Sequence, residues 1–77
     1  MKGIRLSHGV VFVFDGVHTV RLSPSGKCEP SPVTYHTLEH ELQTEPPHTW
    51  EYLTEGDIRG LDGFAQIENV FKTLHTY

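Results

Sequence analysis

The sequence is short of most features that would assign a function directly. It has a single cysteine, Cys28, which excludes an internal disulfide and a Cys-x-x-Cys metal knuckle. No apolar run approaches the roughly 18 residues that a membrane-spanning helix needs, and residues 1–9 lack the apolar segment of a signal peptide. We therefore expect a cytoplasmic protein that makes no contact with a membrane.

Catalytic patterns are also missing. There is no Gly-x-Ser-x-Gly elbow and no phosphate-binding loop, because Pro24-Ser25-Gly26 has the composition of a β-turn. Cys28 lies beside proline-rich sequence with no fixed base nearby, which disfavours a role as nucleophile. The sequence therefore predicts a non-catalytic protein that uses no cofactor.

Basic residues are scarce in the middle of the chain. The net charge is −4, and between residues 29 and 62 Arg59 is the one basic residue. The acidic residues of that segment are Glu29, Glu39, Glu41, Glu45, Glu51, Glu55, Asp57 and Asp62. Such a surface disfavours direct nucleic-acid binding, which needs cations to neutralise phosphates. It favours docking on a protein with a basic surface, although acidic residues also simply keep a small domain soluble.

A β-hairpin over residues 9–22 organises the chain. Val10–Phe14 is a run of β-branched and aromatic residues, and Asp15-Gly16 follows it directly as a turn signal before a second strand begins at Val17. A two-residue loop would pair Phe14 with Val17, and a four-residue loop would leave the faces unchanged. Strand alternation predicts one purely apolar face, made by Val11, Val13, Val20 and Leu22.

The opposite face of the hairpin carries two phenylalanine rings, Phe12 and Phe14, among polar residues. These rings must be shielded from water, and three ways of doing so are possible. A helix of the same chain could pack on them, a protein partner could bind them, or a second copy could bury them in a structural homodimer.

Short elements extend the sheet on both sides of the hairpin. Alternation over Ile4–Leu6 predicts a first strand, and His8-Gly9 favours a turn after it. The alternative is one long strand over 3–14 with a bulge at Gly9. A few extended residues around Cys28 follow the second turn, before Pro30 and Pro32 prevent regular structure.

Two helices and one further strand are predicted in the second half. Apolar residues at helical spacing predict a helix over 34–44, capped by Thr34, and a longer one over 62–75, capped by Asp62. Pro46-Pro47 would stop the first helix. Alternation over 48–54 predicts a strand, with a helical turn as the alternative, and glycines make 55–60 a loop.

Together these elements predict a single α+β domain over residues 1–77. Its antiparallel meander has three or four strands and contains the hairpin 9–22. The helix 62–75 packs on the Val11/Val13 face, and the helix 34–44 lies nearby.

The pattern His36-x-x-Glu39-His40 is the one motif with metal chemistry. On a helix it places two imidazoles at i and i+4, where both could bind one Zn²⁺ while the glutamate acts as general base. The five residues resemble the signature of the inverted zincin metallopeptidases. Those enzymes need a further acidic ligand, and no spacing here selects Glu51 or Glu55. A zinc-dependent hydrolase is thus an alternative function.

Aromatic and acidic residues alternate in the predicted strand 48–54. Trp50 and Tyr52 share one face, and Glu51 and Glu55 are close in sequence, a composition typical of binding hot spots. The other interpretation makes the two rings the lid of the core. The predicted protein-binding residues are Trp50, Glu51, Tyr52, Glu55 and Asp57, with Phe12 and Phe14 as a second surface.

Near the C-terminus, Gly60-Leu61 and Gln66-Ile67-Glu68-Asn69 stand in a final amphipathic helix that follows an antiparallel meander. In these residues, its size and its element order, the chain resembles the small phage-encoded anti-CRISPR inhibitors. The resemblance implies a non-enzymatic protein that binds a CRISPR effector complex in the host cytoplasm and blocks access to target DNA. It assigns no role to any single residue.

Overall fold

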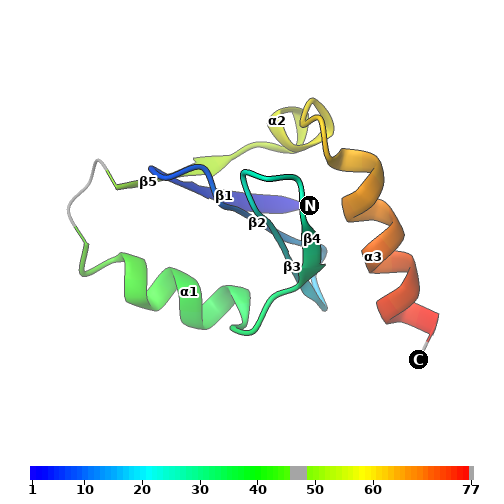
Figure 1. The fold of residues 1–77 in the computed structure, drawn as a ribbon. Coiled ribbons are helices and arrows are strands. Elements are labelled where there is room, and N and C mark those ends of the chain that lie inside the picture. The colour runs from blue at the N-terminus through cyan, green and yellow to red at the C-terminus, as the bar shows by residue number, and fades with distance from the viewer. Residues whose placement is uncertain (46–48, 77) are drawn as a thin grey trace.

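Five short strands form one antiparallel sheet in the order β4-β3-β2-β1-β5, with helices on both faces (Figure 1). The computed structural model describes residues 1–45 and 49–76. The elements are β1 (Lys2–Leu6), β2 (Val11–Phe14), β3 (Thr19–Leu22), β4 (Cys28–Pro30), α1 (Tyr35–Leu42), β5 (Trp50–Leu53), α2 (Glu55–Arg59) and α3 (Phe64–Thr76). The predicted α+β class is confirmed, and the sheet has five strands rather than three or four.

The hairpin has a four-residue loop, so the pairing of Phe14 with Val17 is wrong. Phe14 pairs with Thr19 and Val13 with Val20. The Asp15 carboxylate causes the longer loop, because its Oδ1 accepts from the backbone N–H groups of Val17 at 2.8 Å and His18 at 2.7 Å. Gly16 takes a φ of 105°, which residues with a side chain rarely adopt. The division of residues between the two faces is as predicted.

The first core lies between the sheet and the helices α2 and α3. Its buried members are Val11, Val13, Val20, Leu53, Ile58, Ile67 and Phe71. They unite the apolar face of the hairpin with the stripe of α3, as the spacing predicts. Helix α3 begins at Phe64, so Asp62 lies two residues before the helix rather than at its predicted cap.

The second core lies on the other face, beneath α1. Its buried members are Ile4, Val10, Phe12, Tyr35, Leu38 and Leu42. Thr34 caps α1 as predicted, since its side chain accepts from the N–H of Thr37. The helix ends at Leu42, and the predicted stop at Pro46-Pro47, like the predicted strand residue His48, lies outside the described residues.

Residues 55–59, predicted as a loop, form the short helix α2. Thr54 accepts from the N–H of Asp57 at 3.1 Å, and Asp57 accepts from the N–H of Thr54 at 3.0 Å. This reciprocal capping box outweighs the low helix propensity of Gly56. Gly60, also predicted as part of the loop, is the C-cap of α2.

Within residues 1–45 and 49–76, no helix has both the length and the apolar character needed to cross a membrane.

Replacing Thr54 by alanine should lower the free energy of unfolding by about 1 kcal/mol, because the Asp57 N–H at the start of α2 loses its acceptor. Thr54→Ser should retain most of the stability, since its hydroxyl also caps. Urea unfolding measures both. Thr73→Ala is the matched control, because the Thr73 hydroxyl only donates to the Asn69 carbonyl within α3. Equal stability of Thr54→Ala and the native protein would contradict the capping role.

Candidate functional site

Most of the predicted binding residues lie along one edge of the sheet. Trp50, Glu51 and Tyr52 belong to β5, which pairs with β1 and, within residues 1–45 and 49–76, with no other strand. Glu55 and Asp57 follow directly on α2. The structure therefore groups these five residues around the outer edge of β5.

Phe12 and Phe14 lie in β2 and do not belong to this edge. Phe12 is 6% exposed beneath α1. The Phe14 ring stacks on Tyr35 with 5.1 Å between the ring centroids, and Lys2 Nζ lies 5.8 Å from the centre of the Phe14 ring. Of the three sources of cover, the chain itself buries Phe12, while Phe14 stays half-buried beside Tyr35 and Lys2.

Trp50 joins α1 to the sheet. Its indole Nε1–H donates to the carbonyl of Leu42 at 3.0 Å, which satisfies an acceptor at the C-terminal end of the helix. The half-buried ring meets Tyr52 edge-to-face, with 4.9 Å between centroids. Trp50 therefore has a structural role at this edge, as the lid interpretation predicts, while one side of the ring lies near the surface.

Tyr52 is exposed and yet fixed in place. Its side chain is 53% exposed, the largest exposed aromatic surface in the described residues. The hydroxyl donates to Glu39 Oε2 of α1 at 2.8 Å. This hydrogen bond is the main reason that the pKa of Tyr52 is raised, and burial and the Glu39 charge add to it. Tyr52 is thus tethered to α1 by its hydroxyl while its ring faces solvent.

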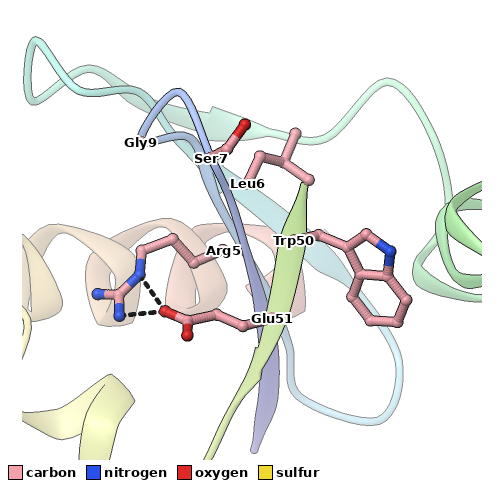
Figure 2. A pocket seen from close by; sticks show the side chains of 6 residues that line it. All are labelled: Arg5, Leu6, Ser7, Gly9, Trp50 and Glu51. Carbon is pink, nitrogen blue, oxygen red and sulfur yellow. Dashed lines mark hydrogen bonds and ion pairs between the residues drawn. The ribbon is translucent and has the colours of Figure 1, made fainter. Parts of the chain in front are cut away.

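The neighbouring ion pair lies on the opposite face of the β1–β5 ladder. Arg5 Nε donates to Glu51 Oε1 at 2.7 Å, and a second guanidinium nitrogen contacts the same oxygen. Figure 2 shows both side chains on one side of the strands and Trp50 on the other. A shallow hollow of about 280 Å³ surrounds the start of β5, lined by Arg5, Leu6, Ser7, Gly9, Trp50 and Glu51.

The acidic residues of α2 are engaged locally. Backbone and side-chain hydrogen bonds with Thr54 hold the pKa of Asp57 below its ordinary value. Glu55 Oε1 lies 3.4 Å from the Met1 amino group and 3.7 Å from Arg59 Nη2. Both side chains are exposed, so they shape the charge of the surface as well as stabilising α2.

The two histidines of the possible zinc motif share a shallow hollow on α1 with Glu39 and Gln43. Glu39 already accepts the hydrogen bond from Tyr52. Among residues 1–45 and 49–76, no group of three or more histidine, cysteine, aspartate or glutamate side chains is arranged to hold a metal ion. The pair His36 and His40 therefore has no third ligand in that part of the chain.

Cys28 is half-buried on β4 and packs against the first core. Burial, and secondarily the charge of Glu29, raises the pKa of its thiol. A raised pKa lowers the thiolate fraction, which agrees with the sequence argument against a nucleophile.

A polar cluster at the hairpin tip was not predicted. Asp15 Oδ2 lies 2.5 Å from His75 Nε2, and the rings of His18 and His75 meet edge-to-face at 4.9 Å. These residues are up to 60 positions apart. Because no local pattern links them, only the packing of α3 brings them together, and the cluster ties the end of α3 to the hairpin.

The comparisons with known proteins leave the site to be judged on its geometry. No protein-family model, curated protein or solved structure matches the chain.

The hairpin-tip cluster should make stability depend on acid pH. Burial raises the pKa of Asp15, but hydrogen bonds from His75, His18 and Val17 outweigh it, so the pKa lies below its ordinary value. The charged carboxylate therefore stabilises the folded state above about pH 4, and this contribution disappears as the pH falls through the folded-state pKa.

Asp15→Asn keeps an acceptor for the turn and removes the charge. We expect the variant to be less stable than the native protein at pH 7 and the difference to vanish toward pH 2, measured by urea unfolding across pH. Asp62→Asn, at an exposed site, controls for the loss of one carboxylate. A difference independent of pH would rule out this linkage.

Proposed function

We propose that the protein is a non-catalytic binding module that docks on a basic protein surface through the edge of β5. The observation that carries the proposal is Tyr52, an aromatic ring that is both exposed and held by Glu39. We call Trp50, Glu51, Tyr52 and Glu39 the β5 surface.

Ordered aromatics suit binding because little side-chain entropy is lost when they contact a partner. Tyrosine and tryptophan are also enriched among the residues that dominate binding energies. In the β5 surface the two rings are in contact with each other, which lets a partner bury both together.

Charge supports a basic partner. Glu39 accepts a hydrogen bond from Tyr52; Glu41 and Glu45 lie on or next to α1, and Asp57 lies on α2. Arg5 is engaged with Glu51, and Arg59 with Glu55. Because these two arginines are already paired, they would not compete with the cations of a partner for the remaining carboxylates. Those carboxylates would attract the partner's basic residues.

The likeness to anti-CRISPR inhibitors in Gly60-Leu61 and Gln66-Ile67-Glu68-Asn69 suggests the first partner to test. On this proposal the protein is an inhibitor from a phage or mobile element, acts in the host cytoplasm and binds a CRISPR effector complex. The basic channels that such nucleic-acid-handling complexes need fit the acidic character of the β5 surface.

Tyr52→Ala should abolish capture of the partner and leave the protein folded, because more than half of the Tyr52 side chain is exposed. The measurement is an affinity pull-down from bacterial lysate, with and without EDTA, followed by mass spectrometry. Val17→Ala is the matched control, since Val17 is 69% exposed at the distant hairpin tip. We expect Val17→Ala to retain at least nine-tenths of the captured partner.

Two results would reject the proposal. One is a partner captured equally by Tyr52→Ala and the native protein, which would place the interface elsewhere. The other is a partner lost with EDTA, which would favour the metal-dependent alternative at His36 and His40.

A further inference from the structure

One contact shows which residues of β5 direct their backbone N–H and C=O groups toward β1 and which direct them away from the sheet. The Ser7 N–H donates to the Thr49 carbonyl at 2.8 Å, so Ser7 and Thr49 form a hydrogen-bonded pair. Pairs of this kind alternate along an antiparallel ladder. Given the register of β1 with β5, Glu51 and Leu53 therefore bond to β1, while the N–H and C=O groups of Trp50 and Tyr52 point away from the sheet.

The other side of β1 agrees with this assignment. The Leu6 N–H donates to the Val10 carbonyl at 2.9 Å, so Leu6 and Ile4 direct their backbone groups toward β2. Arg5 and Gly3 must then direct theirs toward β5. The two ladders independently give the same outward positions, Trp50 and Tyr52.

The two edges of the sheet differ in their capacity to accept another strand. On β4 the contacts of Lys27 with Ser23 and of Ser31 with Thr19 make Cys28 and Pro30 the outward positions. Pro30 has no N–H to offer, and α3 packs against this strand. Among the described residues, no element pairs with the outer side of β5. Only β5 therefore offers a repeating donor and acceptor edge.

We propose that β5 binds its partner by strand addition: an extended, basic segment of another protein pairs with Trp50 and Tyr52 and becomes a sixth strand. This inference rests on the proposed function and specifies its mode of recognition. Main-chain hydrogen bonds would provide affinity, and alternate side chains of the added strand would provide specificity.

The two faces of the sheet define the chemistry of the added segment. Side chains on one face would pack beside the Trp50 and Tyr52 rings, which favours apolar residues. Side chains on the other face would lie beside Glu51, whose two contacts with Arg5 both use Oε1, and near α2, which carries Asp57, so lysine or arginine is favoured there. A segment in which apolar and basic residues alternate satisfies both faces.

A second copy of the chain fits less well. Antiparallel pairing of two β5 strands with Trp50 opposite Tyr52 places Glu51 directly opposite Glu51 of the copy. Like charges in that position are destabilising, and since each Glu51 is already paired with its own Arg5, a second copy brings no free cation to them. Charge therefore favours a basic partner over self-association.

The test uses two capped nine-residue peptides, one alternating lysine with valine and one alternating glutamate with valine. Amide hydrogen exchange of the full chain is followed by NMR. We expect the lysine peptide at saturation to slow exchange at Trp50 and Tyr52 at least tenfold. Glu51 and Leu53, already bonded to β1, should be unchanged, and the glutamate peptide should have no effect.

A pair of variants isolates the backbone contribution. Tyr52→Val and Tyr52→Pro both lose the ring, but only proline removes the outward N–H, and an edge position tolerates it. Tyr52→Val should retain the slowing at Trp50 caused by the lysine peptide, and Tyr52→Pro should abolish it. Far-ultraviolet circular dichroism confirms that both variants are folded.

Three outcomes would overturn the inference. The lysine peptide could leave Trp50 and Tyr52 unprotected, the two variants could behave alike, or protection could rise with protein concentration alone, which would make a second copy the occupant. Suppose one of the first two outcomes occurs and Tyr52→Ala still abolishes capture of a partner. The proposed function would then stand, but binding would not be by strand addition. Failure to capture any partner would instead count against the proposed function.

Discussion

The pairing of β1 with β5 is the interaction on which the rest of the structure depends. The chain leaves the sheet at β4, on one edge, and returns at β5, on the other. The segment that connects β4 to β5 must therefore cross one face of the sheet. Helix α1 crosses it and packs over Phe12 and Ile4. The chain then returns over the opposite face as α2 and α3. The pairing thus places α1 on one face, and with α2 and α3 on the other the interior of a small chain is divided into two cores.

Much of the local structure was predictable because its causes are local. The faces of the hairpin follow from strand alternation, and the Thr34 cap and the stripe of α3 follow from helical spacing. The hairpin register was not predictable from Asp15-Gly16 alone. That pair suits a two-residue turn, yet the Asp15 carboxylate also bonds two N–H groups of a four-residue loop. The glycines at 56 and 60 predict a loop, whereas the capping box of Thr54 and Asp57 stabilises the short helix α2.

The candidate site was only partly predictable. Trp50 and Tyr52 were found from composition and alternation, but their difference in role depends on α1. The helix buries part of Trp50 through the Leu42 carbonyl and fixes Tyr52 through Glu39. Contacts between such distant residues leave no periodic pattern in a single sequence. The same applies to Asp15 and His75, and to α1 as the cover for Phe12, because a sequence shows an apolar stripe without showing which face of a sheet receives it.

In the sheet, β1 lies between β2, which is close to it in the sequence, and β5, which is far from it, and this difference affects the order in which the chain folds. β2 follows β1 after a short turn, whereas Arg5 and its β5 partner Glu51 are 46 residues apart. Closing the longer loop costs more entropy, so we expect the meander to form first and β5 to dock late. Until then, the outer edge of β1 is open to any β5 segment, including that of a neighbouring chain. Reciprocal exchange of β5 between two chains would recreate the native ladder in each, so the fold contains a route to a swapped dimer at high concentration.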